Sequence, residues 1–279
     1  MRWLFLFHHL HGFPGSLPFQ SWNRFPHFCT FLQDYTEPMN ASETNREIYL
    51  ECEKRHIFLL LMFVGGFYGA YTYSCRGGVF CNAQTANFVL FSMKLGQGEW
   101  LGALYYLIPM SAYLLGSMLS ELLPGPIRRR YMLRWDTLLI GIEMLVVLLL
   151  GFIPDSAPFQ ISQVAVNLIC SMQYNTFRQA RGIPMATTFC TNHLRQLGIS
   201  LVKYYRHPGT VLVHRRMTMH SAMLVVFVLG GILASFLCRY FSGRTIWMAL
   251  VPLAVIFVQL LYADRVREVT LHDFVPRGH

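Results

Sequence analysis

The chain has 279 residues, of which 54% are apolar and 13% are charged, and its formal net charge is +9. This charged fraction is about half that of an average soluble domain, and stretches such as 217–238 contain no Asp, Glu, Lys or Arg. So few charged side chains cannot cover a globule of this size, which excludes a disordered chain and an ordinary water-soluble enzyme. The basic residues flank apolar runs, as they do in cytoplasmic loops of membrane proteins, and this argues against nucleic-acid binding.

Residues 1–56 form an N-terminal extension that differs from the rest of the chain. Residues 1–38 are rich in Phe, His and Pro, have no helical or alternating periodicity, and contain an apolar run too short for a signal peptide. Residues 40–56 are polar and mixed in charge, as expected for an amphipathic helix that leads into a first span. This change of composition leaves two start sites open, Met1 and Met39.

Six apolar runs follow the extension, and each is long enough, or nearly so, to cross about 30 Å of hydrocarbon as a helix. Prolines interrupt the chain between several of them, where a helix must stop. We therefore predict an all-α fold, a polytopic bundle of membrane helices with six spans. The predicted spans are residues 57–73, 100–122, 135–153, 161–177, 217–236 and 246–262.

Two further segments, 76–95 and 181–201, are compatible with a helix but contain many polar residues. Neither segment can face lipid around its whole circumference, because a polar group without a partner costs several kcal/mol in hydrocarbon. These segments must line protein or water. They are either re-entrant, entering and leaving the membrane on one side, or additional polar spans.

The two polar segments are also similar to each other, which indicates an internal duplication. Arg76 and Gly77 precede Asn87 at the spacing with which Arg181 and Gly182 precede Asn192. The offset of 105 residues (181 minus 76) also superimposes the neighbouring apolar runs. We predict a first membrane repeat over 57–153, a second over 154–262 and a tail over 263–279.

The distribution of Lys and Arg discriminates between six and eight crossings. Eight crossings would separate the basic cluster at 128–134 from the one at 203–216, whereas six crossings place both in the cytoplasm with the two chain termini. Charge therefore favours six, with two inverted repeats of three spans each. We expect a bacterial inner membrane as the location, and anionic lipid headgroups as the partner of the basic surface at 193–216.

The residues from Gly65 to Phe67 and from Arg76 to Asn87, with Pro109 and Gly116 in the next span, resemble the YoaK family of bacterial membrane proteins. The resemblance covers about residues 57–262. It implies a multi-pass membrane protein of unestablished activity, and it singles out the triplets that end at Asn87 and Asn192 together with Gln173. The chain departs from the family pattern at Gly69, where Asp is frequent, and at Tyr174, where Asn is usual.

Candidate functional residues are the polar side chains inside or beside the predicted spans. Glu143 is the one acid deep in a predicted span, and it is either an ion or proton site or a paired structural carboxylate. Arg76 and Arg181 could meet an anion or reach lipid phosphate, and the asparagines could line a path or join helices. The predicted pathway residues are Arg76, Thr85, Asn87, Glu143, Gln173, Arg181 and Asn192.

Recognisable catalytic and cofactor motifs are absent from the sequence, so we expect no cofactor and no metal. There is no glycine-rich phosphate loop followed by Lys, no His-Glu-x-x-His and no Gly-x-Ser-x-Gly. His207 and His214 lack zinc-ligand spacing, and the spacing of the seven cysteines indicates no disulfide. We predict a transporter or channel for a small polar or anionic solute, whose transport could be linked to that of a proton. The alternatives are a non-catalytic membrane scaffold and an intramembrane enzyme.

Overall fold

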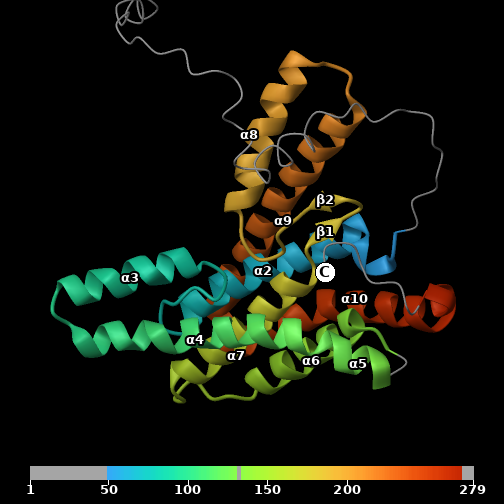
Figure 1. Ribbon diagram of the computed structural model, residues 1–279. Helices are drawn as coiled ribbons and strands as arrows, with labels where there is room; N and C mark the ends of the chain where they lie inside the picture. Colours follow the sequence, from blue (N-terminus) through green and yellow to red (C-terminus); the bar gives the residue numbers. More distant parts are fainter. Residues whose placement is uncertain (1–48, 131–132, 272–279) are drawn as a thin grey trace, which may run out of the picture. The chain divides into compact units, whose positions relative to one another are not determined.

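The computed structural model describes residues 49–130 and 133–271, and these residues are almost entirely helical (Figure 1). The principal helices are α2 (Arg55–Cys75), α3 (Gln84–Gly96), α4 (Trp100–Leu122), α5 (Pro124–Arg130), α6 (Trp135–Leu150), α7 (Phe159–Thr176), α8 (Thr191–Arg206), α9 (Val211–Phe241) and α10 (Leu250–Tyr262). Short helical turns are η2 (Glu51–Glu53), η3 (Ser242–Ala249), η4 (Ala263–Arg267) and η5 (Val269–Leu271), and two strands, β1 (Gln179–Ala180) and β2 (Ile183–Pro184), pair antiparallel. The predicted all-α class is confirmed.

Helix α2 is the centre of the bundle, and most of its side chains between Ile57 and Thr72 are buried. Leucine, phenylalanine and methionine supply the apolar surface, while glycines allow neighbouring backbones to approach closely. The helix ends at Cys75 with Arg76 as its cap residue, and Gly77 then adopts a positive φ of 81°, which glycine tolerates without steric cost. The chain therefore turns back toward the middle of α2.

The helices pack against one another in pairs. The most extensive helix contact is between α2 and α9, followed by that between α4 and α7. Helix α3 lies along α4, and α8 lies along α9, so that each pair forms an antiparallel hairpin (Figure 1). Helices α6 and α10 contact each other and complete the bundle beside α7 and α2.

Three helical stretches are long and apolar enough to cross a membrane: Arg55–Cys75, Trp100–Ile127 and Val211–Arg267. The protein therefore has the helices of a membrane protein. Helix α6 has 16 residues and α10 has 13, shorter than the runs predicted from apolar composition, because each run ends or begins in a turn. The six-span arrangement and the duplication remain predictions.

A disulfide joins Cys75 at the end of α2 to Cys238 near the end of α9, with a Cα–Cα distance of 6.4 Å. The sequence carries no indication of this pair, since 163 residues separate the two cysteines and both lie in apolar surroundings. The described cysteines outside this pair are Cys52, Cys81, Cys170 and Cys190, and only Cys190 is partly exposed. Residues 1–48, which include both candidate start sites, Met1 and Met39, lie outside the described residues.

Candidate solute cavity

The helices α2 and α9 cross at glycines, and this crossing forms one side of a cavity. A Cβ atom at Gly66 would collide with the backbone carbonyl of Phe227, and one at Gly230 would collide with the carbonyl of Phe63. No residue larger than glycine fits at either position without moving a helix backbone. The two helix axes are therefore held at their closest approach in the middle of α2.

The loop 77–83, which precedes α3, folds back along α2 as far as this crossing. The side-chain amide of Asn82 donates a hydrogen bond of 2.9 Å to the carbonyl oxygen of Gly65. The backbone N–H of Cys81 donates to the Thr72 hydroxyl at 3.3 Å. Gly65 lies ten residues, about 15 Å along the axis, from the end of α2 at Cys75. Helix α3 consequently begins about halfway along α2.

A second loop, residues 185–190, reaches the same part of α2 from the other direction. It leaves the hairpin of β1 and β2, in which Gln179 pairs with Pro184, and precedes α8. The backbone of Thr187 and Thr188 lies so close to Gly65 that a Cβ there would be 3.0 Å from the Thr188 Cα. Both polar segments thus bring the start of a helix to the middle of α2.

A cavity of about 430 Å³ lies between the two loops and the crossing. Its walls include Ala83 and Cys190, the residues that precede the first turns of α3 and α8. Two helix N-termini therefore meet at one cavity, and their free N–H groups give it a partial positive charge. The lining residues are Gly66, Gly69, Ala70, Phe80, Asn82, Ala83, Thr188, Phe189, Cys190, Thr191, Phe227, Val228 and Gly231.

Two polar side chains in the lining are fixed by their surroundings. Asn82 is held by Gly65, and a Cβ at Gly69 would lie 2.7 Å from the Asn82 amide nitrogen. The Thr188 hydroxyl is fully buried beside that of Tyr113 and makes no hydrogen bond of normal geometry. A buried hydroxyl with unused hydrogen-bonding capacity is costly unless a further group binds to it.

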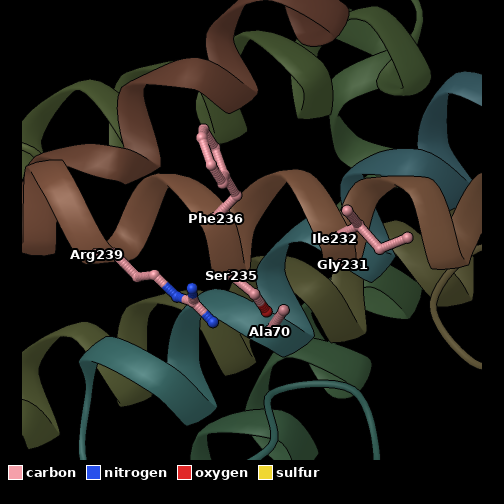
Figure 2. A pocket seen from close by; sticks show the side chains of 6 residues that line it. All are labelled: Ala70, Gly231, Ile232, Ser235, Phe236 and Arg239. Carbon is pink, nitrogen blue, oxygen red and sulfur yellow. The ribbon is translucent and has the colours of Figure 1, made fainter.

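A groove of about 480 Å³ continues from the cavity along α9, and the two share Ala70 and Gly231 (Figure 2). Ile232 and Phe236 make most of its surface apolar. Figure 2 shows the Arg239 guanidinium extending along the groove toward Ser235 and Ala70. The groove thus carries a cation near the end of α9.

The chain matches a known protein family. A family model described as "Protein of unknown function (DUF1275)" matches residues 57–259. The chain belongs to this family. No curated protein and no solved structure matches the chain. The family membership expected from the sequence is confirmed at this level, while the resemblance to YoaK in particular remains a prediction.

The DUF1275 segment contains the predicted pathway residues, but none of them lines the cavity. Asn87 is fully buried and binds the backbone of Phe80 twice, accepting from its N–H at 3.1 Å and donating to its oxygen at 2.6 Å. It therefore closes the loop before α3. Thr85 is exposed on α3, and Asn192, which is half-buried on α8, accepts a hydrogen bond of 3.2 Å from Arg195.

The two predicted arginines lie at opposite ends of α2, about 30 Å apart along its axis. Arg76 is 1% exposed; its Nε donates to the Tyr71 hydroxyl at 2.8 Å, and its Nη1 lies 3.6 Å from Asp155. Arg181 is exposed with a φ of 47°, and its amide donates to the Glu53 carbonyl at 3.1 Å. The arginines therefore do not form one site.

Glu143 and Gln173 are fully buried in the DUF1275 bundle, away from the cavity. The Glu143 carboxyl lies beside the Tyr68 hydroxyl, but its two oxygens complete no hydrogen bond of normal geometry. Gln173 donates a long hydrogen bond of 3.4 Å to the Leu61 carbonyl, and its own oxygen makes none. Both side chains face helix α2.

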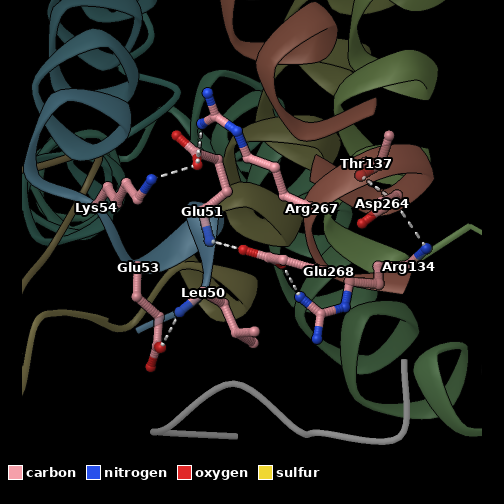
Figure 3. Close-up of polar contacts among 9 residues, drawn as sticks. All are labelled: Leu50, Glu51, Glu53, Lys54, Arg134, Thr137, Asp264, Arg267 and Glu268. Atoms are coloured by element: carbon pink, nitrogen blue, oxygen red, sulfur yellow. Dashed lines mark hydrogen bonds and ion pairs between the residues drawn. The ribbon is translucent and has the colours of Figure 1, made fainter. Parts of the chain in front are cut away.

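A network of buried charges joins the start of α2, the start of α6 and the segment after α10 (Figure 3). Glu268 accepts a hydrogen bond of 2.7 Å from the Glu51 amide and forms an ion pair of 2.6 Å with Arg134. Asp264 accepts from the Thr137 hydroxyl at 2.7 Å and from the Arg134 amide at 3.1 Å. We call this network the α2–α10 cluster.

The residues that line the cavity could not be recognised as a group from the sequence. Asn82 and Thr188 are polar residues within the two segments, but neither belongs to the triplets that end at Asn87 and Asn192. The loops place Asn82 and Thr188 together only because both fold back along α2. In the described residues, no group of three or more His, Cys, Asp or Glu side chains could hold a metal ion.

Proposed function

We propose that this protein is a transporter or channel for a small polar or anionic solute, which binds in the cavity between α2 and α9. The observation that carries the proposal is the meeting of two helix N-termini, those of α3 and α8, at this cavity. Short helices that end within a membrane commonly direct their N-terminal N–H groups at an anionic or polar solute. The Asn82 side-chain amide and the Thr188 hydroxyl would form the hydrogen bonds that orient the solute.

The packing of the helices supports a duplication. The offset of 105 residues relates α2 to α7 and α4 to α9, and the two most extensive contacts, α2 with α9 and α7 with α4, are exchanged by this relation. The close crossings agree as well. Gly66 meets α9, and Ser171, which is 105 residues later, meets α4 at Gly116.

The buried ion pair between Arg134 and Glu268 favours six crossings over eight. Glu51 precedes α2, Arg134 precedes α6 and Glu268 follows α10, so six crossings put all three on the cytoplasmic side. Eight crossings would put Arg134 on the opposite side from Glu51 and Glu268, although the α2–α10 cluster joins them. Both arrangements put the disulfide of Cys75 and Cys238 on the outer side, where oxidising conditions preserve it.

Proton linkage is part of the proposal, and Glu143 is a candidate for the coupling group. It is the fully buried acid on α6. A carboxylate inside the membrane is costly, so it usually has a functional role or pairs with another polar group. Its neighbour Tyr68 belongs to α2, next to Gly69 of the cavity wall. This arrangement connects the acid to the cavity through one turn of α2.

The test is a solute screen followed by uptake measurements. Purified protein is screened by thermal shift against small inorganic anions, short carboxylates and neutral polar solutes, because binding to the native state raises the unfolding temperature. Hits are then tested for uptake into proteoliposomes. Thr188→Val, which keeps the shape of the side chain, should reduce binding and uptake at least about tenfold, which corresponds to about 1.4 kcal/mol.

Thr85→Val is the matched control, because Thr85 is exposed on α3 and outside the cavity. It should bind and transport as the wild type does. Equal solute binding by the wild type and the Thr188→Val variant would contradict the proposed site. A protein that binds none of the solutes and transports none would instead favour a scaffold.

A further inference from the structure

The side chains of His193 and His220 form a buried pair that the proposed solute site does not use. His193 is in the first turn of α8, and His220 is on α9; their exposed fractions are 0% and 1%. The two Nδ1 atoms are 2.9 Å apart, and Nε2 of His193 is 2.7 Å from the carbonyl oxygen of Ala186. The pair thus connects both helices to the loop that forms one wall of the cavity.

The hydrogen bonds determine where the protons reside. A carbonyl oxygen can only accept, so Nε2 of His193 carries a proton and its Nδ1 is an acceptor in the neutral ring. Nδ1 of His220 must then carry the proton shared with His193, which leaves Nε2 of His220 free to accept one. A single added proton at that nitrogen breaks no existing hydrogen bond.

A second added proton is different, because it would place two N–H groups against each other between the Nδ1 atoms. The pair therefore holds one extra proton, on His220 or, after transfer across the 2.9 Å hydrogen bond, on His193. In the transferred form His193 donates from Nδ1 to His220, whose neutral ring carries its proton on Nε2. The two rings thus constitute one proton-binding site.

The surroundings oppose a positive charge on this pair. Burial lowers the pKa of His193, which lies outside the three candidate spans. Arg216 precedes His220 by one turn on α9 and repels a second cation. On α8, Arg195 pairs with Asn192, and the loop contributes the Ala186 carbonyl. No carboxylate of the described chain is among the groups that act on either ring.

The helix dipole of α8 adds to this opposition, and it connects the pair to the cavity. His193 is the third residue of α8, so a proton there adds positive charge to a helix end that is already partly positive. An anion in the cavity beside Cys190 and Thr191 would neutralise this end of α8. Proton and anion would then stabilise each other.

We propose that His193 and His220 form a one-proton site whose occupancy is coupled to negative charge in the cavity. This deepens the proposed function and rests on it, since it makes the cavity the site of the anion. Coupling free energies are reciprocal, so protonation of the pair strengthens anion binding by the factor by which the anion strengthens protonation. The arrangement is suited to moving a proton and an anion together.

Cys190 provides a test that needs no knowledge of the solute. It lines the cavity immediately before α8, and its thiol is partly exposed. In a Cys29→Ser background, the protein is labelled at Cys190 with a sulfonatoethyl methanethiosulfonate or with its neutral hydroxyethyl counterpart. The imidazoles of ¹⁵N-histidine-labelled protein are then titrated by NMR, with assignments from His193→Gln and His220→Gln.

We expect the two rings to titrate together with uptake of one proton, at a pH midpoint about 0.5 to 1 higher with the sulfonate than with the hydroxyethyl group. The same labels at Thr85→Cys in a Cys190→Ser background should give equal midpoints, because Thr85 is exposed on α3. Uptake of two independent protons, or equal midpoints for the two labels at Cys190, would overturn the proposal. A solute screen without hits counts against the proposed function but leaves this measurement valid.

Discussion

Arg134 and Glu268 are 134 residues apart in the sequence and form a 2.6 Å ion pair in which both side chains are about nine-tenths buried. A buried charge that loses its partner is strongly destabilising, whereas an exposed ion pair contributes little. Loss of either partner would therefore weaken the attachment of the segment after α10 to the start of α6.

Replacement of Arg134 by Ala should lower the free energy of unfolding by about 3 to 5 kcal/mol, because Glu268 would remain buried without its cation. The apparent unfolding temperature in detergent measures the effect. Lys94→Ala is the control, since the ion pair of Lys94 with Glu99 is exposed and should contribute little to stability. Equal effects of the two changes would show that the α2–α10 cluster contributes no special stability.

The crossing of α2 and α9 predicts a strong difference between neighbouring glycines. Gly230→Ala should destabilise the protein by about 3 kcal/mol, the upper end of the range for overpacking, since the new Cβ meets the Phe63 carbonyl. Gly231→Ala should be nearly neutral, because its Cβ would be at ordinary contact distances of 3.6 Å and 3.8 Å. Folded yield and thermal stability of both variants check this prediction, which fails if Gly230→Ala is tolerated.

Six crossings predict the side from which single cysteines can be labelled. In a cysteine-free background, cysteines at Glu121 and Arg206 should react only from the cytoplasm, and one at Ser156 only from the outside. Each of these positions is exposed. Membrane-impermeant maleimides applied to intact cells and to inverted vesicles distinguish the sides. Labelling of Glu121 and Arg206 positions from opposite sides would establish eight crossings.

Cys190 should react with thiol reagents only slowly at neutral pH. Partial burial raises its pKa to about 11, so at pH 8 about one thiol in a thousand is the reactive thiolate. A raised pKa moves the reactive form to higher pH, and the labelling rate should increase about tenfold per pH unit from 8 to 10. Rates that level off near pH 9 would indicate an ordinary thiol and contradict the burial of this wall of the cavity.

Much of the fold could be predicted from the sequence, because apolar runs determine where membrane helices form. The run at 100–122 is α4, and those at 57–73 and 135–153 are α2 and α6 within a few residues. The largest difference is in α9, which begins at Val211 and takes in the basic residues before residue 217. Charged residues at a helix end do not stop a helix that continues beyond the apolar zone.

The site could be predicted only in part, because it depends on how loops fold rather than on periodicity. Both polar segments were recognised, but within each the structure separates a returning loop from a helix, so that the loop residues Asn82 and Thr188 form the cavity. Asn87 has the appearance of a pathway residue in the sequence, but it closes a turn onto Phe80. The pairing of His193 with His220 has no sequence signal, because 27 residues separate the two.

The disulfide of Cys75 and Cys238 links the two crossing helices α2 and α9 covalently, so that they move as one rigid unit. Helices α2 and α9 touch at Gly66 and Gly230 and are tied again near their ends, and two fixed points on a pair of rods prevent a scissor motion. The side of the cavity formed by α2 and α9 is therefore held both at the helix crossing and near the helix ends. Reduction of the disulfide would leave the glycine contact as the single point that joins the two helices, and α2 and α9 could then rotate about it and widen the cavity.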